Sequence, residues 1–134
     1  MIEIRLFQPE DLAVIAAIQT ASPEASQWNV AEYECRVALL DCAIAGFLVV
    51  RQTAPDEREI LNLAVDPRFR RRGIARELLR NALNESASVW FLEVRESNQA
   101  AIFLYKSLGF RVVGTRPGYY SNPVESGVVM KLGS

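Results

Sequence analysis

Histidine is absent from this sequence of 134 residues. Its absence excludes Ser-His and Cys-His nucleophile pairs, histidine general bases and most zinc or non-haem iron sites. We therefore expect no metal site. Any acid–base chemistry must come from Asp, Glu, Tyr, Lys or Cys side chains.

Cysteine is nearly absent as well. The two that are present, Cys35 and Cys42, lie seven positions apart and match no metal-ligand spacing. Nothing in the sequence indicates an oxidising compartment in which they would pair. The interpretation that we favour is that both are buried free thiols.

Long apolar runs are also lacking, since none approaches the roughly 20 residues that span a membrane. The first five residues do not have the basic-then-apolar order of a signal peptide. These absences favour a cytoplasmic protein with no membrane partner. Half of the residues are apolar and 23% are charged, which at this length predicts one globular domain over residues 1–134.

The formal net charge is only −1, but the charge is unevenly distributed. Residues 68–80 carry +5, so the rest of the chain carries −6. A concentrated basic loop in an acidic protein suits a small anion, whereas a nucleic-acid partner usually needs a basic face; we expect no nucleic-acid partner. A solvated, arginine-rich helix start is the alternative, and charge alone favours it. The arginines of this segment are Arg68, Arg70, Arg71, Arg72, Arg76 and Arg80.

Hydrophobic periodicity and turn residues predict a mixed α/β fold whose first half is largely antiparallel. Strands are predicted at residues 2–7, 37–40, 44–51, 60–65, 89–95, 110–113 and 128–132. Helices are predicted at residues 9–20, 28–35, 73–84 and 98–108. Residues 52–59 and 114–127 are predicted to be loops.

The strongest local pattern lies between a buried strand and an amphipathic helix, from Val65 to Ala75. The first turn of a helix has unpaired N–H groups and a positive dipole end, so a glycine at the bend lets the backbone wrap a phosphate. Gly73 and Ala75 leave room for such an approach, although the P-loop ending and the three-glycine fingerprint are missing. A simple turn into a surface helix is the alternative.

A second group of candidates follows the strand at residues 89–95. Glu93 interrupts an otherwise apolar strand, so we expect partial desolvation and a raised pKa, which suits a general base. A salt bridge to Arg95 or to another arginine is an equally plausible interpretation. Asn98 and Tyr105 lie almost two turns apart on the next helix and share one stripe. By itself, Tyr105 is typical of a core tyrosine.

These residues carry a resemblance to a known family. The segment from Leu61 to Tyr120 resembles the GNAT superfamily of acetyl-coenzyme A (acetyl-CoA) dependent N-acetyltransferases, with Arg70-x-x-Gly73-x-Ala75 matching its pyrophosphate-binding motif. It is most similar to the RimI group, which acetylates protein N-terminal amines. The resemblance implies a GNAT fold: a mostly antiparallel six- to seven-stranded sheet, splayed in the middle and flanked by about four helices. The RimI-like residues are Leu92-Glu93-Val94-Arg95, Ser97-Asn98, Ala101-Ile102, Leu104-Tyr105, Gly109-Phe110, Arg116 and Tyr119-Tyr120.

The resemblance also implies roles. Glu93 would accept a proton from the amine, Tyr105 would protonate the departing thiolate, and transfer would be direct in a ternary complex. Cofactor-binding positions would be Leu63, Ala64 and Val65 for the pantetheine arm, Arg70, Arg71, Arg72, Gly73, Ile74, Ala75 and Arg76 for the pyrophosphate, and Asn98. Trp28, Tyr119 and Tyr120 would line the acceptor groove.

The sequence departs from the family pattern at several positions. Arg70 and Ala75 stand where glutamine and glycine are common, Ser26-Gln27 precedes Trp28 in place of Phe-Pro, and Glu125-Ser126-Gly127 replaces a Glu-Asp pair. The interpretation is acetylation of a primary amine, foremost a protein N-terminus. A small amine such as an amino acid or polyamine, or a non-catalytic coenzyme A-binding module, is the alternative. We expect a monomer or weak homodimer.

Overall fold

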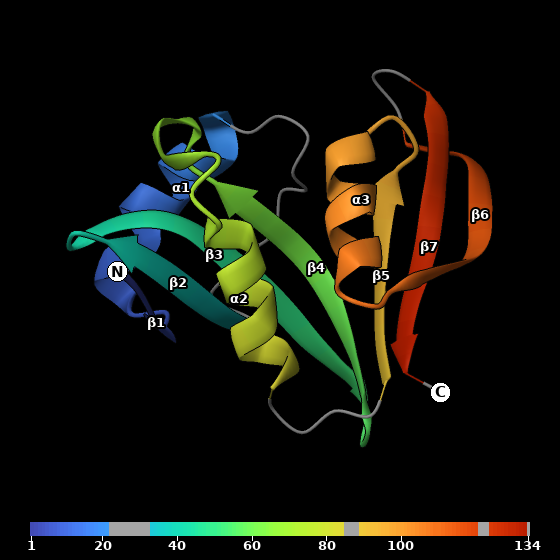
Figure 1. Ribbon diagram of the computed structural model, residues 1–134, viewed down its shortest axis with the longest axis horizontal. Coiled ribbons are helices and arrows are strands. Elements are labelled where there is room, and N and C mark those ends of the chain that lie inside the picture. The colour runs from blue at the N-terminus through green and yellow to red at the C-terminus, as the bar shows by residue number, and fades with distance from the viewer. Residues whose placement is uncertain (22–32, 85–88, 121–123, 134) are drawn as a thin grey trace. The chain divides into compact units, whose positions relative to one another are not determined.

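The computed structural model describes residues 1–21, 33–84, 89–120 and 124–133 (Figure 1). Within them, the chain forms three α-helices and a seven-stranded sheet with strand order β1-β2-β3-β4-β5-β7-β6. This confirms the predicted mixed α/β class and the mostly antiparallel sheet. The chain divides into two compact units, residues 1–51 with 61–86 and residues 52–60 with 87–134, called here the first and second units.

In the first unit, three antiparallel strands pack between two helices. The strands are β1 (Ile2–Leu6), β2 (Glu34–Leu40) and β3 (Ala43–Ala54), and the helices are α1 (Leu12–Ala21) and α2 (Ile74–Leu83). Ile15 and Ile18 of α1 form a core cluster with residues at every second position along parts of β2 and β3, such as Val37. Arg36 points the other way and donates to Asn81 of α2 over 2.6 Å. Because strand side chains alternate between faces, α1 and α2 cover opposite faces.

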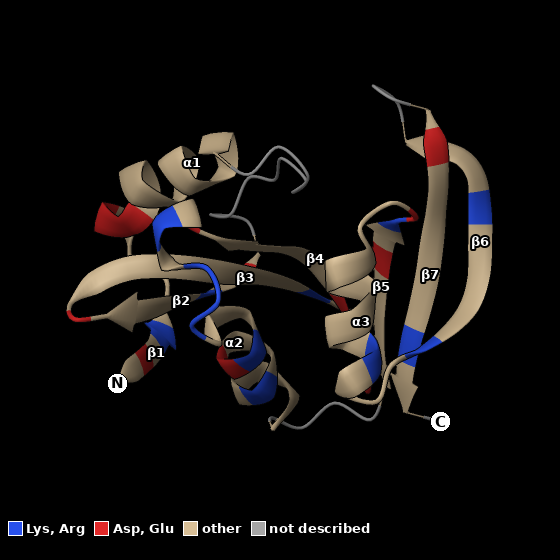
Figure 2. Ribbon diagram, turned by 45° about the horizontal axis from the view of Figure 1, so that its top comes forward, with Lys and Arg blue, Asp and Glu red and all other residues tan. Residues whose placement is uncertain are grey.

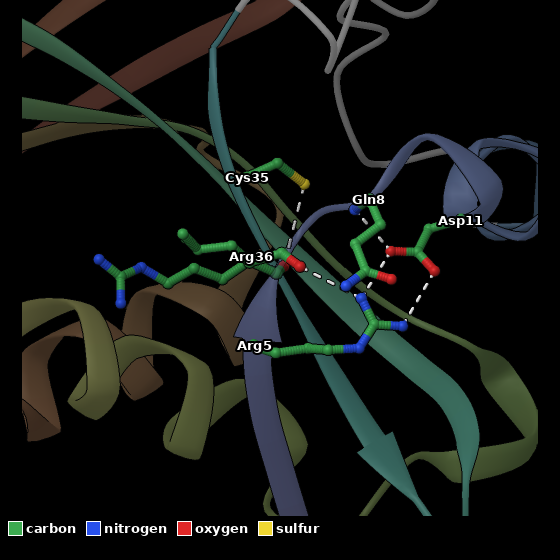
Figure 3. A network of polar contacts seen from close by, with 6 residues as sticks. Arg5, Gln8, Asp11, Cys35 and Arg36 are labelled. Atoms are coloured by element: carbon green, nitrogen blue, oxygen red, sulfur yellow. Dashed lines mark hydrogen bonds and ion pairs between the residues drawn. The ribbon is translucent and has the colours of Figure 1, made fainter.

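A buried carboxylate fixes the start of α1 (Figure 3). Asp11 ends a short 3-10 helix (Pro9–Asp11) and is 5% exposed. Arg5 of β1 donates to both of its carboxylate oxygens, over 2.8 and 3.0 Å, and the Gln8 N–H donates over 2.8 Å. The Arg5 hydrogen bonds hold the pKa of Asp11 below its ordinary value. This network ties β1 to α1.

Asp11→Asn is expected to lower the free energy of unfolding by about 1–2 kcal/mol at pH 7, because one charge-assisted pair is lost. A carboxyl group with a lowered folded-state pKa stabilises the protein above its unfolded pKa, and this contribution disappears as the pH falls through the folded value. The difference between the proteins should therefore shrink below about pH 4. Urea unfolding of both proteins at pH 7 and below about pH 4 measures this difference in the free energy of unfolding. Glu10→Gln changes the exposed neighbouring residue, and an equal loss of stability in that variant would contradict this explanation.

The second unit is built on the opening part of β4 (Glu57–Val65) and on three further strands. Glu57–Ile60 pairs in parallel with β5 (Val89–Arg95), and β5 pairs antiparallel with β7 (Glu125–Gly133). The edge strand β6 (Arg111–Tyr120) pairs antiparallel with β7. The helix is α3 (Gln99–Ser107). The buried residues of the second unit include Trp90, Leu92, Ile102, Tyr105, Phe110 and Met130.

Both long predicted loops are wrong. Of residues 52–59, only the turn at residues 55–56 separates β3 from β4. In the segment 114–127, β6 continues to Tyr120 and β7 begins at Glu125. Gly114, Pro117 and Gly118 are of types common in loops, but an edge strand with register shifts tolerates such residues.

Two smaller predictions also change. Residues 28–32 of the predicted helix 28–35, with Trp28, lie outside the described residues, while Glu34 and Cys35 belong to β2. Both cysteines are free, and Cys35 is buried, which raises the pKa of its thiol to about 12. Cys42 is exposed because it occupies the β2–β3 turn, so its predicted burial is wrong.

In the described segments, no helix is both long and apolar enough to span a bilayer. The single domain over residues 1–134 and the splay of the sheet stay predictions.

Candidate functional site

The first unit carries the arginine-rich loop between β4 and α2. After Val65, the Asp66 side chain accepts the Arg68 N–H over 2.9 Å and begins a 3-10 turn (Pro67–Phe69). The Arg68 guanidinium also donates to Asp66 over 2.8 Å, and these hydrogen bonds lower the pKa of Asp66. Asp66 therefore stays ionised and fixes how the chain leaves the sheet.

Gly73 is the N-cap of α2, as its predicted place at the bend requires. It has φ +76°, and a Cβ added there would meet nothing within 4 Å. The first intrahelical hydrogen bond runs from the Glu77 N–H to the Gly73 carbonyl over 3.0 Å. The N–H groups of Ile74, Ala75 and Arg76 precede that bond and have no partner within the helix. Unpaired N–H groups at the start of a helix can hold an anion.

Arginines surround this helix start (Figure 2). Arg68 is held by Asp66 and lies 5.5 Å from the centre of the Phe69 ring, and Arg80 lies 3.8 Å from Glu77. Arg71 has φ +65°, an uncommon conformation for a residue other than glycine. The other arginines of the loop are the exposed Arg70 and Arg72 and the half-buried Arg76. The charge of the loop is thus concentrated just before α2.

The predicted pantetheine positions lie at the end of β4. Ala64 is buried, and Leu63 and Val65 are half-buried. Their backbone direction continues into the arginine-rich loop, but a role in binding stays a prediction.

The second unit carries Glu93 on β5, with a side chain that is 15% exposed. Its Oε1 atom lies 3.4 Å from Nε of Arg116, and among the described residues its buried Oε2 has no hydrogen-bond partner. Burial raises the pKa of Glu93, Arg116 opposes that effect, and Glu59 adds to it. The predicted desolvation is confirmed. The alternative, a salt bridge from Glu93 to Arg95 or to another arginine, is also confirmed, and the partner is Arg116.

Tyr105 of α3 is 6% exposed, and its ring meets the edge of the Phe110 ring at 5.7 Å. Burial, with a smaller contribution from Tyr120, raises the pKa of Tyr105 well above its ordinary value. Its hydroxyl therefore remains protonated and able to donate at any physiological pH. The structure agrees with the core-tyrosine interpretation without excluding a catalytic one.

Tyr120 links the two candidates electrostatically. Burial and then the charge of Glu93 raise its pKa to about 12, and Tyr120 in turn acts on Tyr105. Arg95 lies 4.5 Å over its ring and bonds to Glu125 over 2.9 Å. Glu93, Tyr105 and Tyr120 therefore share one neighbourhood of the second unit.

Tyr119 extends this neighbourhood toward solvent. It is 54% exposed, and its ring meets Tyr120 edge-on at 5.0 Å. The Arg116 guanidinium lies 5.1 Å over the Tyr119 ring. Asn98 caps α3, its side chain accepting the Ala101 N–H over 3.2 Å, so its carbonyl oxygen is already engaged within the protein.

Arg116 and Glu125 are the residues that sequence reasoning missed as parts of this site. Each is paired with a residue more than twenty positions away, Glu93 and Arg95 respectively. The sequence of β6 carries no period-2 signal that could have found them, because nearly all of its residues are exposed and it contains Gly114, Pro117 and Gly118. The registers of β5 and β6 on β7 bring these charges together.

Residues 5–110 match the family described as the Acetyltransferase (GNAT) family. The chain belongs to this family. The match covers the arginine-rich loop, Glu93 and Tyr105, so the resemblance of the sequence to the GNAT superfamily is confirmed.

Within this family, the chain is similar in sequence to N-acetyltransferases that act on a ribosomal protein. The chain is 41% identical over 99 residues to the [ribosomal protein bS18]-alanine N-acetyltransferase of Salmonella typhimurium, a match that covers 69% of this chain and 66% of the relative. Among the first curated relatives, the chain spans between 21% and 66% of their length.

Solved structures support the fold. The crystal structure of the ribosomal-protein-S18-alanine N-acetyltransferase from Escherichia coli superposes with a TM-score of 0.84 at 29% identity, covering 98% of this chain and 93% of that chain. A GNAT family acetyltransferase from Elizabethkingia anophelis with acetyl-CoA bound gives a TM-score of 0.74 at 18% identity, covering 99% and 98%, which shows the fold alone.

Proposed function

We propose that the protein transfers an acetyl group from acetyl-CoA to a primary amine, foremost the N-terminal α-amine of a protein. The observation that carries this proposal is the carboxylate of Glu93, whose side chain is 15% exposed, in the same unit as two tyrosines, Tyr105 and Tyr120, that burial keeps protonated. The Salmonella relative, named for alanine N-acetylation of a ribosomal protein, supports this class of acceptor. A ribosomal protein N-terminus is accordingly the first acceptor to test.

Glu93 is the general base of this proposal. An amine carries a proton at neutral pH and cannot attack a thioester until that proton is removed. The raised pKa of Glu93 brings its basicity closer to the working pH than that of an exposed carboxylate. Its Oε2, which lacks a partner among the described residues, is the atom that we assign to the proton.

Tyr105 is the general acid of this proposal. Burial keeps its hydroxyl protonated, and a buried phenol can give a proton to a leaving thiolate. With a carboxylate and a phenol in these roles, the chemistry needs neither histidine nor a nucleophilic cysteine.

Acetyl-CoA supplies the activated thioester. The residues of the first unit fit its anionic part, because α2 begins with open donors at an αL glycine and with arginines on the preceding loop. We assign the pyrophosphate to residues 70–76 and the pantetheine arm to the backbone of residues 63–65. Asn98, with its amide nitrogen, is assigned to the same ligand.

Tyr119, Tyr120 and Trp28 are assigned to the acceptor. The exposure of Tyr119 and the partial burial of Tyr120 provide an aromatic surface that an extended peptide can cover. Trp28 lies outside the described residues, so its assignment comes from the family resemblance.

The proposal is tested with acetyl-CoA and a panel of acceptors. We expect acetylation of short peptides with free N-termini, strongest for one class of first residue, and none of the same peptides with blocked N-termini. Polyamines and free amino acids form the comparison arm. Activity confined to those small amines would replace the protein acceptor with the small-amine alternative, and no transfer to any amine would leave a coenzyme A-binding module.

A further inference from the structure

Arg116 reaches Glu93 across a strand that separates them. Glu93 lies on β5 opposite Val129 of β7, and Arg116 lies on β6 opposite Gly127 of β7. A Cβ added at Gly127 would come to 2.5 Å from Oε2 of Glu93. The missing side chain at Gly127 therefore leaves the space in which the carboxylate lies and across which the two charges meet.

The pair is built to be separable. Nε of Arg116 lies 3.4 Å from Oε1 of Glu93, and the Arg116 side chain is 60% exposed whereas that of Glu93 is 15% exposed. Its guanidinium also lies over the ring of Tyr119, which keeps it near the carboxylate. An ion pair of this length with an exposed partner is weak enough to be replaced by another cation.

The other charged or titratable groups around Glu93 do not stabilise its negative charge. Glu59 of β4 is a carboxylate and disfavours ionisation of Glu93. Tyr120 of β6 is neutral at physiological pH, Arg95 of β5 is bonded to Glu125, and Glu125 of β7 is itself an acid. Arg116 is thus the cation whose charge favours the ionised form of Glu93.

We propose that Arg116 is a positioning residue that acts as the counterion of Glu93 in the free protein, keeps the carboxylate ionised and gives way to the ammonium group of the acceptor. This rests on the proposed function, in which Glu93 then removes a proton from that ammonium. The exchange of one cation for another leaves the net charge around the carboxylate unchanged. Arg116 itself transfers no proton.

The test is a carbon-13 NMR titration of the side-chain carboxyl carbon of Glu93, assigned by its absence in Glu93→Gln. In Arg116→Met, we expect the midpoint to rise by about 0.5 to 1 pH unit, less than for a fully buried pair because Arg116 is exposed. Arg116→Lys should return it close to the wild-type value. Arg111→Met removes an exposed arginine of the same strand and should leave the midpoint unchanged. An unchanged midpoint in Arg116→Met, or an equal rise in Arg111→Met, would overturn the inference.

Activity separates this inference from the proposed function. If Glu93 is the base, the acidic limb of kcat/KM in Arg116→Met moves with the NMR midpoint, so the rate on that limb falls about three- to tenfold and recovers at higher pH. A loss of rate that is equal at every pH, with an unmoved midpoint, would make Arg116 a structural residue and overturn the inference. A moved midpoint with an unmoved rate profile would support the counterion and overturn Glu93 as the base.

Discussion

Glu93→Gln is expected to lower kcat by about 10²-fold or more while the affinity for acetyl-CoA stays within about twofold of wild type. The amide has nearly the shape of the carboxylate but cannot accept the proton of the acceptor amine, and a lost proton-transfer role costs about this much. Steady-state kinetics with an N-terminal peptide gives kcat, and calorimetry gives the affinity. The activity that remains should have lost the acidic limb of its pH profile.

The matched control is Glu96→Gln, which makes the same chemical change at an exposed position one residue beyond β5. It should leave kcat unchanged. The loss of kcat in Glu93→Gln should not come from unfolding of the variant. The direction of the pKa shift of Glu93 supports this expectation. A carboxyl group with a raised folded-state pKa destabilises the protein above that pKa, so at pH 7 Glu93→Gln should be at least as stable as wild type. Normal turnover by Glu93→Gln would remove Glu93 from the mechanism.

Gly73→Val is expected to weaken acetyl-CoA binding by about tenfold or more at both low and high salt. Gly73 adopts φ +76°, which a β-branched residue enters at a cost of about 1–2 kcal/mol, so the start of α2 must rearrange. The valine side chain would also occupy space at the start of the helix that is open in the structure. Because neither effect is electrostatic, added salt should not relieve it. Gly114→Val adds the same side chain in open space without a positive φ and should bind normally.

Charge reversal in the same loop should behave differently with salt. Arg71→Glu with Arg72→Glu is expected to weaken acetyl-CoA binding more at 20 mM than at 500 mM NaCl, because exposed charges are screened. Arg80→Glu makes the same type of change in the last turn of α2 and should have a much smaller effect. If Gly73→Val and the double variant Arg71→Glu, Arg72→Glu both bound acetyl-CoA like wild type, this would contradict a phosphate site at this loop.

Local patterns were sufficient to predict much of this protein from its sequence. The αL glycine before α2, the Asn98 cap of α3 and the desolvated carboxylate in β5 each depend on a few neighbouring residues, and all three are present. Caps and buried strands have such signals because their hydrogen bonds or side chains are satisfied locally. The second part of the chain was accordingly predicted well up to Phe110.

Prediction failed where strand pairing decided the outcome. The segment from Gly114 to Tyr120 has the composition of a loop, yet it is a strand because β7 supplies its hydrogen bonds. The Glu93–Arg116 pair depends on that register and on the missing side chain of Gly127, neither of which a spacing rule detects. The wrong burial of Cys42 has another cause, because the strands predicted at residues 37–40 and 44–51 already left Cys42 in the turn between them, and its burial was inferred without using that turn.

That turn has a practical consequence. Cys42 is exposed, whereas the thiol of Cys35 is 3% exposed with a pKa of about 12, and it is the thiolate that attacks a thiol reagent. A maleimide dye should therefore label the native chain at one defined position in the first unit, without engineered cysteines. The label would be attached to a protein whose own residues are all retained.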